Sequence, residues 1–85
     1  MNNAKIIGSI LRELRNNKGL SQEQLSGLAV LDRTHYSKLE RGLRSPTIET
    51  LFKIAQALDM KPYQIIKIIE EKINIEYKNI DCMEC

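Results

Sequence analysis

The sequence lacks a long apolar run, because no stretch approaches the roughly 20 apolar residues that a bilayer-spanning helix requires. Its polar start, Met1-Asn2-Asn3, also lacks the apolar core of a signal peptide. The only cysteines, Cys82 and Cys85, lie at the C-terminus, so no disulfide framework is available to hold a domain together. These absences predict a cytoplasmic protein that makes no membrane contact and depends on an apolar core.

Signatures of catalysis and metal binding are equally scarce. The single histidine, His35, has no nucleophile close to it in the sequence, and no glycine-rich phosphate loop is present. Cys82-x-x-Cys85 supplies only half the ligands of a structural zinc site, which a second copy of the chain would have to complete. A redox pair and free thiols are the alternative interpretations. We therefore predict no enzyme activity, no cofactor and no metal.

The charge is small but unevenly distributed. The formal net charge is +2, yet residues 1–45 carry eight Lys/Arg against four Asp/Glu, whereas residues 46–85 carry five against seven. A basic first half suits a protein that places one side on phosphate. The 85 residues suffice for one small domain with a modest core, and such domains often gain stability by association.

Residues 21–40 predict two short helices separated by a tight turn. Ser21 and Gln24 have the spacing of a capping box, in which each side chain bonds the other residue's backbone N–H. Asp32 can cap the second helix, whose inward residues are Tyr36 and Leu39. This arrangement leaves an outward face formed by Arg33, Thr34, Ser37 and Lys38.

The flanking segments predict three more helices. Asn3 can cap a first helix that ends at Gly19 and whose inward residues are Ile7, Ile10, Leu11 and Leu14. Thr47 can cap another, with Ile54 beside a core face of Ile48, Leu51, Phe52, Ala55 and Leu58. Pro62 suits the start of a last helix, with Ile68 off a face formed by Ile65, Ile66, Ile69 and Ile73. Beyond it, the alternation of Ile73, Ile75 and Tyr77 fits either a short strand or a longer helix.

The two-helix stretch, with Arg41-Gly42 and Arg44-Ser45-Pro46-Thr47 after it, resembles the helix-turn-helix regulators related to phage Cro and repressor proteins, the Xre-type family. The run 31–42 is most similar to the controller proteins of restriction-modification systems. The resemblance covers roughly residues 5–70. It implies an all-α, five-helix, lambda-repressor-like domain within residues 1–72, followed by a short extension at 73–85, and a homodimer whose third helix, residues 33–40, enters the major groove. A phage-type or mobile-element repressor is the alternative within this family.

The resemblance also implies roles for individual residues. The expected base contacts are Arg33, Thr34 and Lys38. The expected contacts to the DNA backbone are Gln22, His35, Ser37, Arg41, Arg44 and Ser45. Arg15 matches an arginine that pairs with the glutamate ending the recognition helix, here Glu40. The expected partner is double-stranded DNA carrying an inverted repeat, and RNA polymerase is a further candidate.

Isoleucine is abundant near the end of the chain, which suggests self-association as well as a core. We predict a dimer interface formed by Ile54, Leu58, Ile65, Ile68 and Ile69. The alternative function is that of an antitoxin-type protein, which binds another protein through its C-terminal half. The main departure from the family is Val30, where glycine is usual because the backbone takes positive φ, so we expect a strained or shifted turn there.

Overall fold

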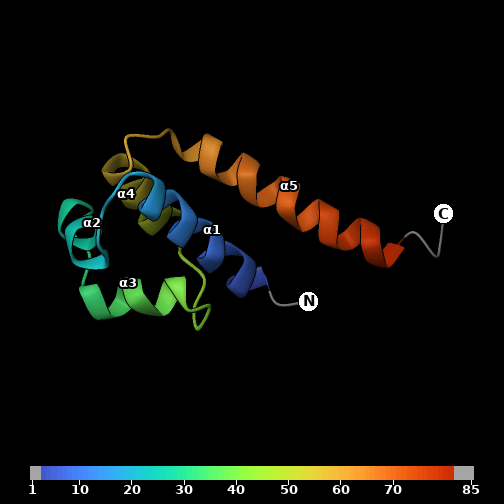
Figure 1. The fold of residues 1–85 in the computed structure, drawn as a ribbon, viewed down its shortest axis with the longest axis horizontal. Helices are drawn as coiled ribbons and strands as arrows, with labels where there is room; N and C mark the ends of the chain where they lie inside the picture. Colours follow the sequence, from blue (N-terminus) through green and yellow to red (C-terminus); the bar gives the residue numbers. More distant parts are fainter. Residues whose placement is uncertain (1–2, 82–85) are drawn as a thin grey trace.

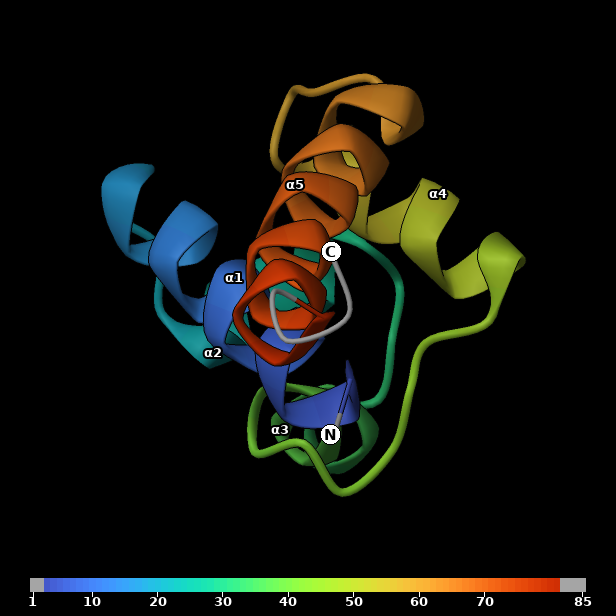
Figure 2. The same cartoon turned by 90° about the vertical axis from the view of Figure 1, so that its right-hand side faces the viewer.

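The computed structural model describes the backbone of residues 3–81 and the side chains of residues 3–75. This part of the chain forms no strand and consists of α1 (Asn3–Asn17), α2 (Gln22–Leu28), α3 (Arg33–Glu40), α4 (Ile48–Ala57) and α5 (Pro62–Asp81). The predicted all-α, five-helix architecture is therefore confirmed. Helix α1 packs against α3 on one side and α5 on the other, so α3 and α5 lie on opposite sides of the molecule (Figures 1 and 2).

Polar side chains fix where three of the helices begin. The Ser21 hydroxyl accepts from the Gln24 N–H at 3.0 Å, and the Gln24 side chain accepts from the Ser21 N–H at 2.8 Å, which completes the predicted capping box at α2. The Asp32 carboxylate caps α3 by accepting from the His35 N–H at 3.0 Å. Thr47 caps α4 in the same way. Each cap was predictable from the residue type and its spacing.

Helices α1 to α4 all end in a Schellman motif, in which a residue with positive φ turns the chain and two backbone N–H groups bond the last free carbonyls. The four positive-φ residues are Gly19, Val30, Gly42 and Asp59. At the end of α2 the Leu31 N–H donates to the Ser26 carbonyl at 2.8 Å, and the Val30 N–H donates to the Gly27 carbonyl at 3.2 Å. The turn between α2 and α3 therefore has the positive φ that the resemblance implied at this position, with valine in place of the usual glycine.

The φ of Val30 is 56°, which confirms the predicted strain. A β-branched side chain in this left-handed region crowds its own backbone. The Val30 side chain is 80% exposed, so its packing does not offset the strain.

The core lies where α2, α3, α4, α1 and the first turns of α5 meet. Its buried members are Leu11, Leu25, Ala29, Tyr36, Leu39, Leu51, Ile54, Ala55, Leu58 and Ile65. Tyr36 and Leu39 hold α3 to this core, as predicted, and leave the opposite side of α3 toward solvent. The core thereby determines which face of α3 a ligand can reach.

The structure corrects the predicted core face of α4 and, with it, the predicted dimer interface. Ile48 and Phe52, which we expected in the core, are 67% and 55% exposed. Conversely, three residues of the predicted interface have no exposed surface, and they are Ile54, Leu58 and Ile65. A side chain enclosed by its own domain has no surface left for a second chain. Of the other two, Ile69 is half-buried against the core, and Ile68 is half-buried in a groove between α1 and α5.

Helix α5 continues unbroken through residues 73–81. The strand alternative for this segment is therefore wrong, and the backbone shows no break at the predicted boundary between residues 72 and 73. Within the described part of the chain, no helix combines the length and the apolar character needed to cross a bilayer. Cys82 and Cys85, for which zinc and redox roles were considered, lie outside the described residues.

Candidate nucleic-acid interface

The outward side of α3 and the start of α2 together form a small polar hollow. It has a volume of about 160 Å³ and is lined by Gln22, Arg33, Thr34, Ser37 and Arg41. Arg33, Ser37 and Arg41 follow one another at four-residue spacing, so they share one stripe of the helix and its C-terminal continuation. All five lining residues were predicted as DNA contacts, two to bases and three to the backbone.

The other four predicted contacts do not line this hollow. Lys38 lies one turn after Thr34 and is half-buried. His35 is also half-buried, whereas Arg44 and Ser45 are exposed in the loop after α3. Because Lys38 has a long stem, its charged head can still reach beyond the helix surface. Arg33 on α3 and Arg41 and Arg44 after it are all exposed to solvent.

An ion pair joins α1 to the end of α3, as the resemblance implied. The Arg15 guanidinium donates to the two Glu40 carboxylate oxygens, at 2.6 Å through Nε and at 3.0 Å through Nη2. Its Nη1 donates to the Leu20 carbonyl at 2.8 Å, which also ties down the turn before α2. The Glu40 side chain has no exposed surface, and the Arg15 side chain is 12% exposed. This bidentate geometry holds α1, α2 and α3 in one arrangement.

Gln22 takes part in the same network. Its side-chain amide donates to Glu40 Oε1 at 2.9 Å. An amide nitrogen carries two hydrogens, so one donor remains for the predicted phosphate contact. The hydrogen bond therefore orients Gln22 beside the polar hollow without consuming its capacity to bind a phosphate.

The network determines the protonation of its buried members. Burial opposes ionisation of Glu40, but the hydrogen bonds from Arg15 and Gln22, together with the nearby Tyr36 hydroxyl, outweigh it and hold the pKa of this carboxyl below its usual range. Burial and, after it, the neighbouring Glu40 carboxylate raise the pKa of the Tyr36 hydroxyl. The bond to Glu40 raises the pKa of Arg15. At neutral pH, Glu40 and Arg15 are therefore charged and Tyr36 is neutral.

Sequence reasoning missed two residues of this region, Arg12 and Gly8. The Arg12 Nε lies 3.6 Å from Glu40 Oε1, and this side chain is 53% exposed. Gly8 is buried where α1 crosses the end of α3. Both precede Arg15 at helical spacing, by three and seven residues, so the face of α1 that carries Arg15 was the signal that could have identified them.

Comparison with known proteins agrees with this geometry. A family described as helix-turn-helix matches residues 11–66. The uncharacterized HTH-type transcriptional regulator y4dJ of Sinorhizobium fredii is 37% identical over 71 residues, which cover 84% of this chain and 92% of that protein.

Two solved structures are similar as well. The restriction-modification controller protein C.AhdI from Aeromonas hydrophila is 42% identical with a TM-score of 0.73, and the match covers 76% of this chain and 98% of that one. The controller C.Esp1396I, solved as a tetramer with its natural 35-base-pair operator, is 27% identical with a TM-score of 0.77, and the match covers 86% and 96% of the two chains.

The five-helix fold and the basic outward side of α3 define a DNA-binding helix-turn-helix protein. The chain belongs to the helix-turn-helix family of Xre-like transcriptional regulators, and its relatives include controller proteins of restriction-modification systems.

Proposed function

We propose that this protein is a restriction-modification controller that binds an inverted-repeat operator as a homodimer, with α3 in the major groove. The observation that carries the proposal is the polar hollow, where the start of α2 and the outward stripe of α3 bring five predicted DNA contacts together. A helix-turn-helix presents its recognition helix to base edges in this way, while the preceding helix lies across the backbone. The operator complex of the similar controller C.Esp1396I supports the proposal.

The roles within the interface follow from side-chain chemistry. Arg33 is exposed at the start of α3, where it can form a bidentate contact with guanine O6 and N7. Thr34 and Lys38 extend the same reading surface. Gln22, Arg41 and Arg44 bind phosphate oxygens around it, and His35, Ser37 and Ser45 supply further backbone contacts. Phosphate contacts hold the register, and base contacts determine the sequence that is read.

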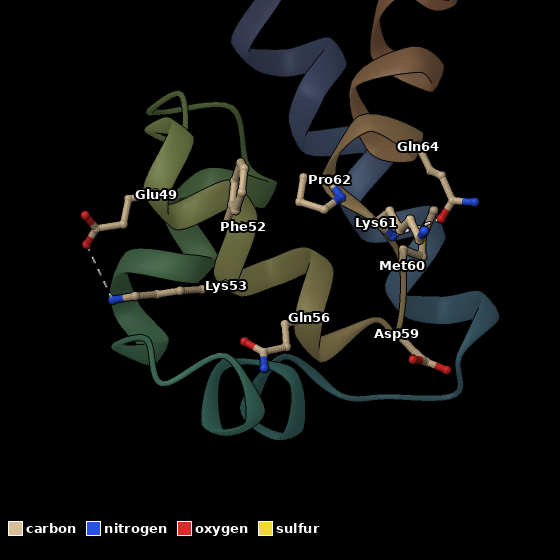
Figure 3. A pocket seen from close by; sticks show the side chains of 9 residues that line it. All are labelled: Glu49, Phe52, Lys53, Gln56, Asp59, Met60, Lys61, Pro62 and Gln64. Carbon is tan, nitrogen blue, oxygen red and sulfur yellow. Dashed lines mark hydrogen bonds and ion pairs between the residues drawn. The ribbon is translucent and has the colours of Figure 1, made fainter.

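A single domain reads few base pairs, so we propose that two copies bind together. The surface that suits a second copy is the α4–α5 face, which we define by its exposed apolar residues Ile48, Phe52, Tyr63 and Ile66. An open groove of about 660 Å³ runs along this face, with Phe52 of α4 on one side and Pro62 of α5 on the other (Figure 3). Ile48 and Ile66 lie one helical turn from Phe52 and Pro62 respectively, so they widen the apolar surface.

The rim of the groove is compatible with a two-fold axis. It carries Glu49 and Asp59 as well as Lys53 and Lys61, so each copy offers both signs of charge (Figure 3). A two-fold interface places the same patch against itself, which favours a patch with mixed charges around an apolar centre. Among the side chains that the structure describes, the rim forms only the weak, exposed Glu49–Lys53 pair, at 4.0 Å. These charges are therefore available to pair across the interface.

Sedimentation of matched variants tests the dimer. Phe52→Glu places a charge in the groove and should give monomers at micromolar concentrations, where the unaltered protein sediments as a dimer. Leu28→Glu is the control, because Leu28 is 61% exposed on α2 and does not line the groove. A dimeric Phe52→Glu protein, or an unaltered protein that is monomeric both alone and on DNA, would contradict the proposed face.

Selection of bound duplexes from a random pool tests the operator. We expect an inverted repeat whose half-sites lie about one DNA turn, roughly 34 Å, apart. A single asymmetric half-site would exclude the homodimer as the binding species. Transcription in vitro with purified RNA polymerase then tests the expected contact with that enzyme. We also propose that the protein acts in the cytoplasm, as the sequence predicts.

A further inference from the structure

One face of α1 lies along the C-terminal end of the recognition helix. This face consists of Lys5, Gly8, Arg12 and Arg15, which recur at intervals of three and four residues. Arg15 and Arg12 reach the Glu40 carboxylate, at 2.6 and 3.6 Å. At the other end of the face, the backbone of Lys5 lies against Gly42, because a Cβ added to Gly42 would come within 2.8 Å of the Lys5 Cα.

Gly8, in the middle of this face, makes the closest backbone contact. A Cβ added at Gly8 would lie 2.5 Å from both the Leu39 and the Glu40 carbonyl oxygens, and 2.9 Å from the Glu40 carbonyl carbon. All three atoms belong to the last turn of α3. A carbon atom normally stays about 3.3 to 3.6 Å from a carbonyl oxygen. Any side chain at Gly8 would therefore have to push α1 and α3 apart.

The last turn of α3 cannot yield to such a side chain locally. The Leu39 carbonyl accepts from the Gly42 N–H at 3.2 Å in the Schellman motif. The Leu39 side chain is fully buried, and the Glu40 carboxylate is held by Arg15 and Gln22. The helix would consequently move as a unit, by about 0.8 Å, if normal contact distances are to be restored.

We infer that Gly8 is a positioning residue for DNA reading, because its missing side chain lets α1 set the depth and tilt of α3. This inference rests on the proposed function. Binding constellations tolerate displacements of only about 0.5 Å, so a shift of the size expected for Gly8→Ala disturbs base contacts. The displaced end carries Lys38, a predicted base contact. Flexible side chains such as that of Arg44 can still reach a phosphate when α3 moves. The loss of affinity should therefore be larger on the operator than on scrambled DNA.

The test compares Gly8→Ala with Gly27→Ala. Both are glycine-to-alanine changes within helices, but a Cβ added at Gly27 meets no atom within 4 Å, so Gly27→Ala adds the same methyl group without displacing α3. Dissociation constants are measured on the selected operator and on a scrambled duplex of equal length at one salt concentration. Amide chemical shifts of the free proteins are recorded in parallel, and they report the packing of α3 in the absence of DNA.

For Gly8→Ala we expect changes in amide chemical shift centred on residues 38–43. Operator affinity should fall about tenfold or more, and affinity for scrambled DNA should fall much less. Gly27→Ala should match the unaltered protein on both duplexes. If Gly8→Ala is unfolded at the assay temperature, the comparison is made at a lower temperature in a Gly27→Ala background, which stabilises α2.

Two results would overturn the inference. One is a folded Gly8→Ala protein that binds the operator within about twofold of the unaltered protein, since the loss of even one base contact should cost more than that. The other is an equal loss on operator and scrambled DNA, which would reduce Gly8 to a residue required only for folding. If the unaltered protein itself shows no sequence preference, the proposed function fails. The chemical shifts would then still decide whether Gly8 positions α3.

Discussion

Replacing Arg15 with methionine should destabilise the domain strongly. Methionine keeps much of the apolar stem but removes the two bonds to Glu40, at 2.6 and 3.0 Å, and leaves the carboxylate with Gln22 at 2.9 Å. Removing one partner of a buried ion pair costs about 3 to 5 kcal/mol. We expect the lower end, about 3 kcal/mol, because Arg12 remains 3.6 Å from Glu40. In a domain of this size, the melting temperature should fall by about 12 to 24 °C.

A double-mutant cycle with Arg15→Met and Glu40→Gln, followed by urea denaturation, measures the interaction itself. The coupling free energy should be about 2 kcal/mol or more, with the double variant less destabilised than the sum of the single ones. A coupling below about 0.5 kcal/mol would refute the reasoning, because exposed pairs already reach that value.

The pH dependence provides a second readout of the same pair. The pKa of Glu40 is lowered in the folded state, so the stability it contributes is present above its unfolded pKa of about 4.3 and is lost as the pH falls through the folded value. Arg15→Met removes the strongest of the bonds that lower this pKa, so the folded pKa of Glu40 moves back toward its unfolded value and the acid-induced loss of stability from this group should shrink. In Glu40→Gln this component of the pH dependence should disappear.

Three further changes test other parts of the structure. Val30→Gly should raise the free energy of unfolding by about 0.5 to 1 kcal/mol, because the relief of left-handed strain exceeds the added flexibility of the unfolded chain; a lower melting temperature would disprove the strain. Tyr36→Phe should change stability by less than about 1 kcal/mol, since the Tyr36 hydroxyl is the one buried side-chain polar atom among the described residues without a well-formed hydrogen bond, and a loss above about 2 kcal/mol would show that it has a partner. Arg33→Ala should cost about 1 to 3 kcal/mol on the operator and relax the preference at one base pair, whereas Arg44→Ala should weaken operator and scrambled DNA equally and flatten the salt dependence; an equal loss for Arg33→Ala on both duplexes would remove its role as a base reader.

Local signals in the sequence were sufficient for the helices around the interface. Caps such as Ser21 and Asp32 act on backbone groups three residues away, so neither depends on the rest of the fold. The inward position of Tyr36 follows from helical spacing after the cap. The outward face of α3, with Arg33 and Thr34, was predictable for the same reason.

The core face of α4 was not predictable, because its apolar residues cover too much of the helix. At 3.6 residues per turn, the six residues from Ile48 to Leu58 span an arc of about 160°. The domain covers only the part of this arc that contains Ile54, and leaves Phe52 outside. Which part is covered depends on where α5 packs, and that is a tertiary property. Gly8 was overlooked for a similar reason, since only the crossing of α1 over α3 reveals that a side chain there has no space.

The most direct test of operator binding is the affinity for the selected duplex and for its scrambled counterpart across a salt series. We predict that the selected inverted repeat is bound at least about 10³-fold more tightly at physiological salt, and that affinity falls with rising salt as expected for several phosphate contacts. Weak, salt-sensitive binding that is equal on both duplexes would contradict sequence-specific regulation. In that case the basic region around α3 would be a general docking surface for polyanions.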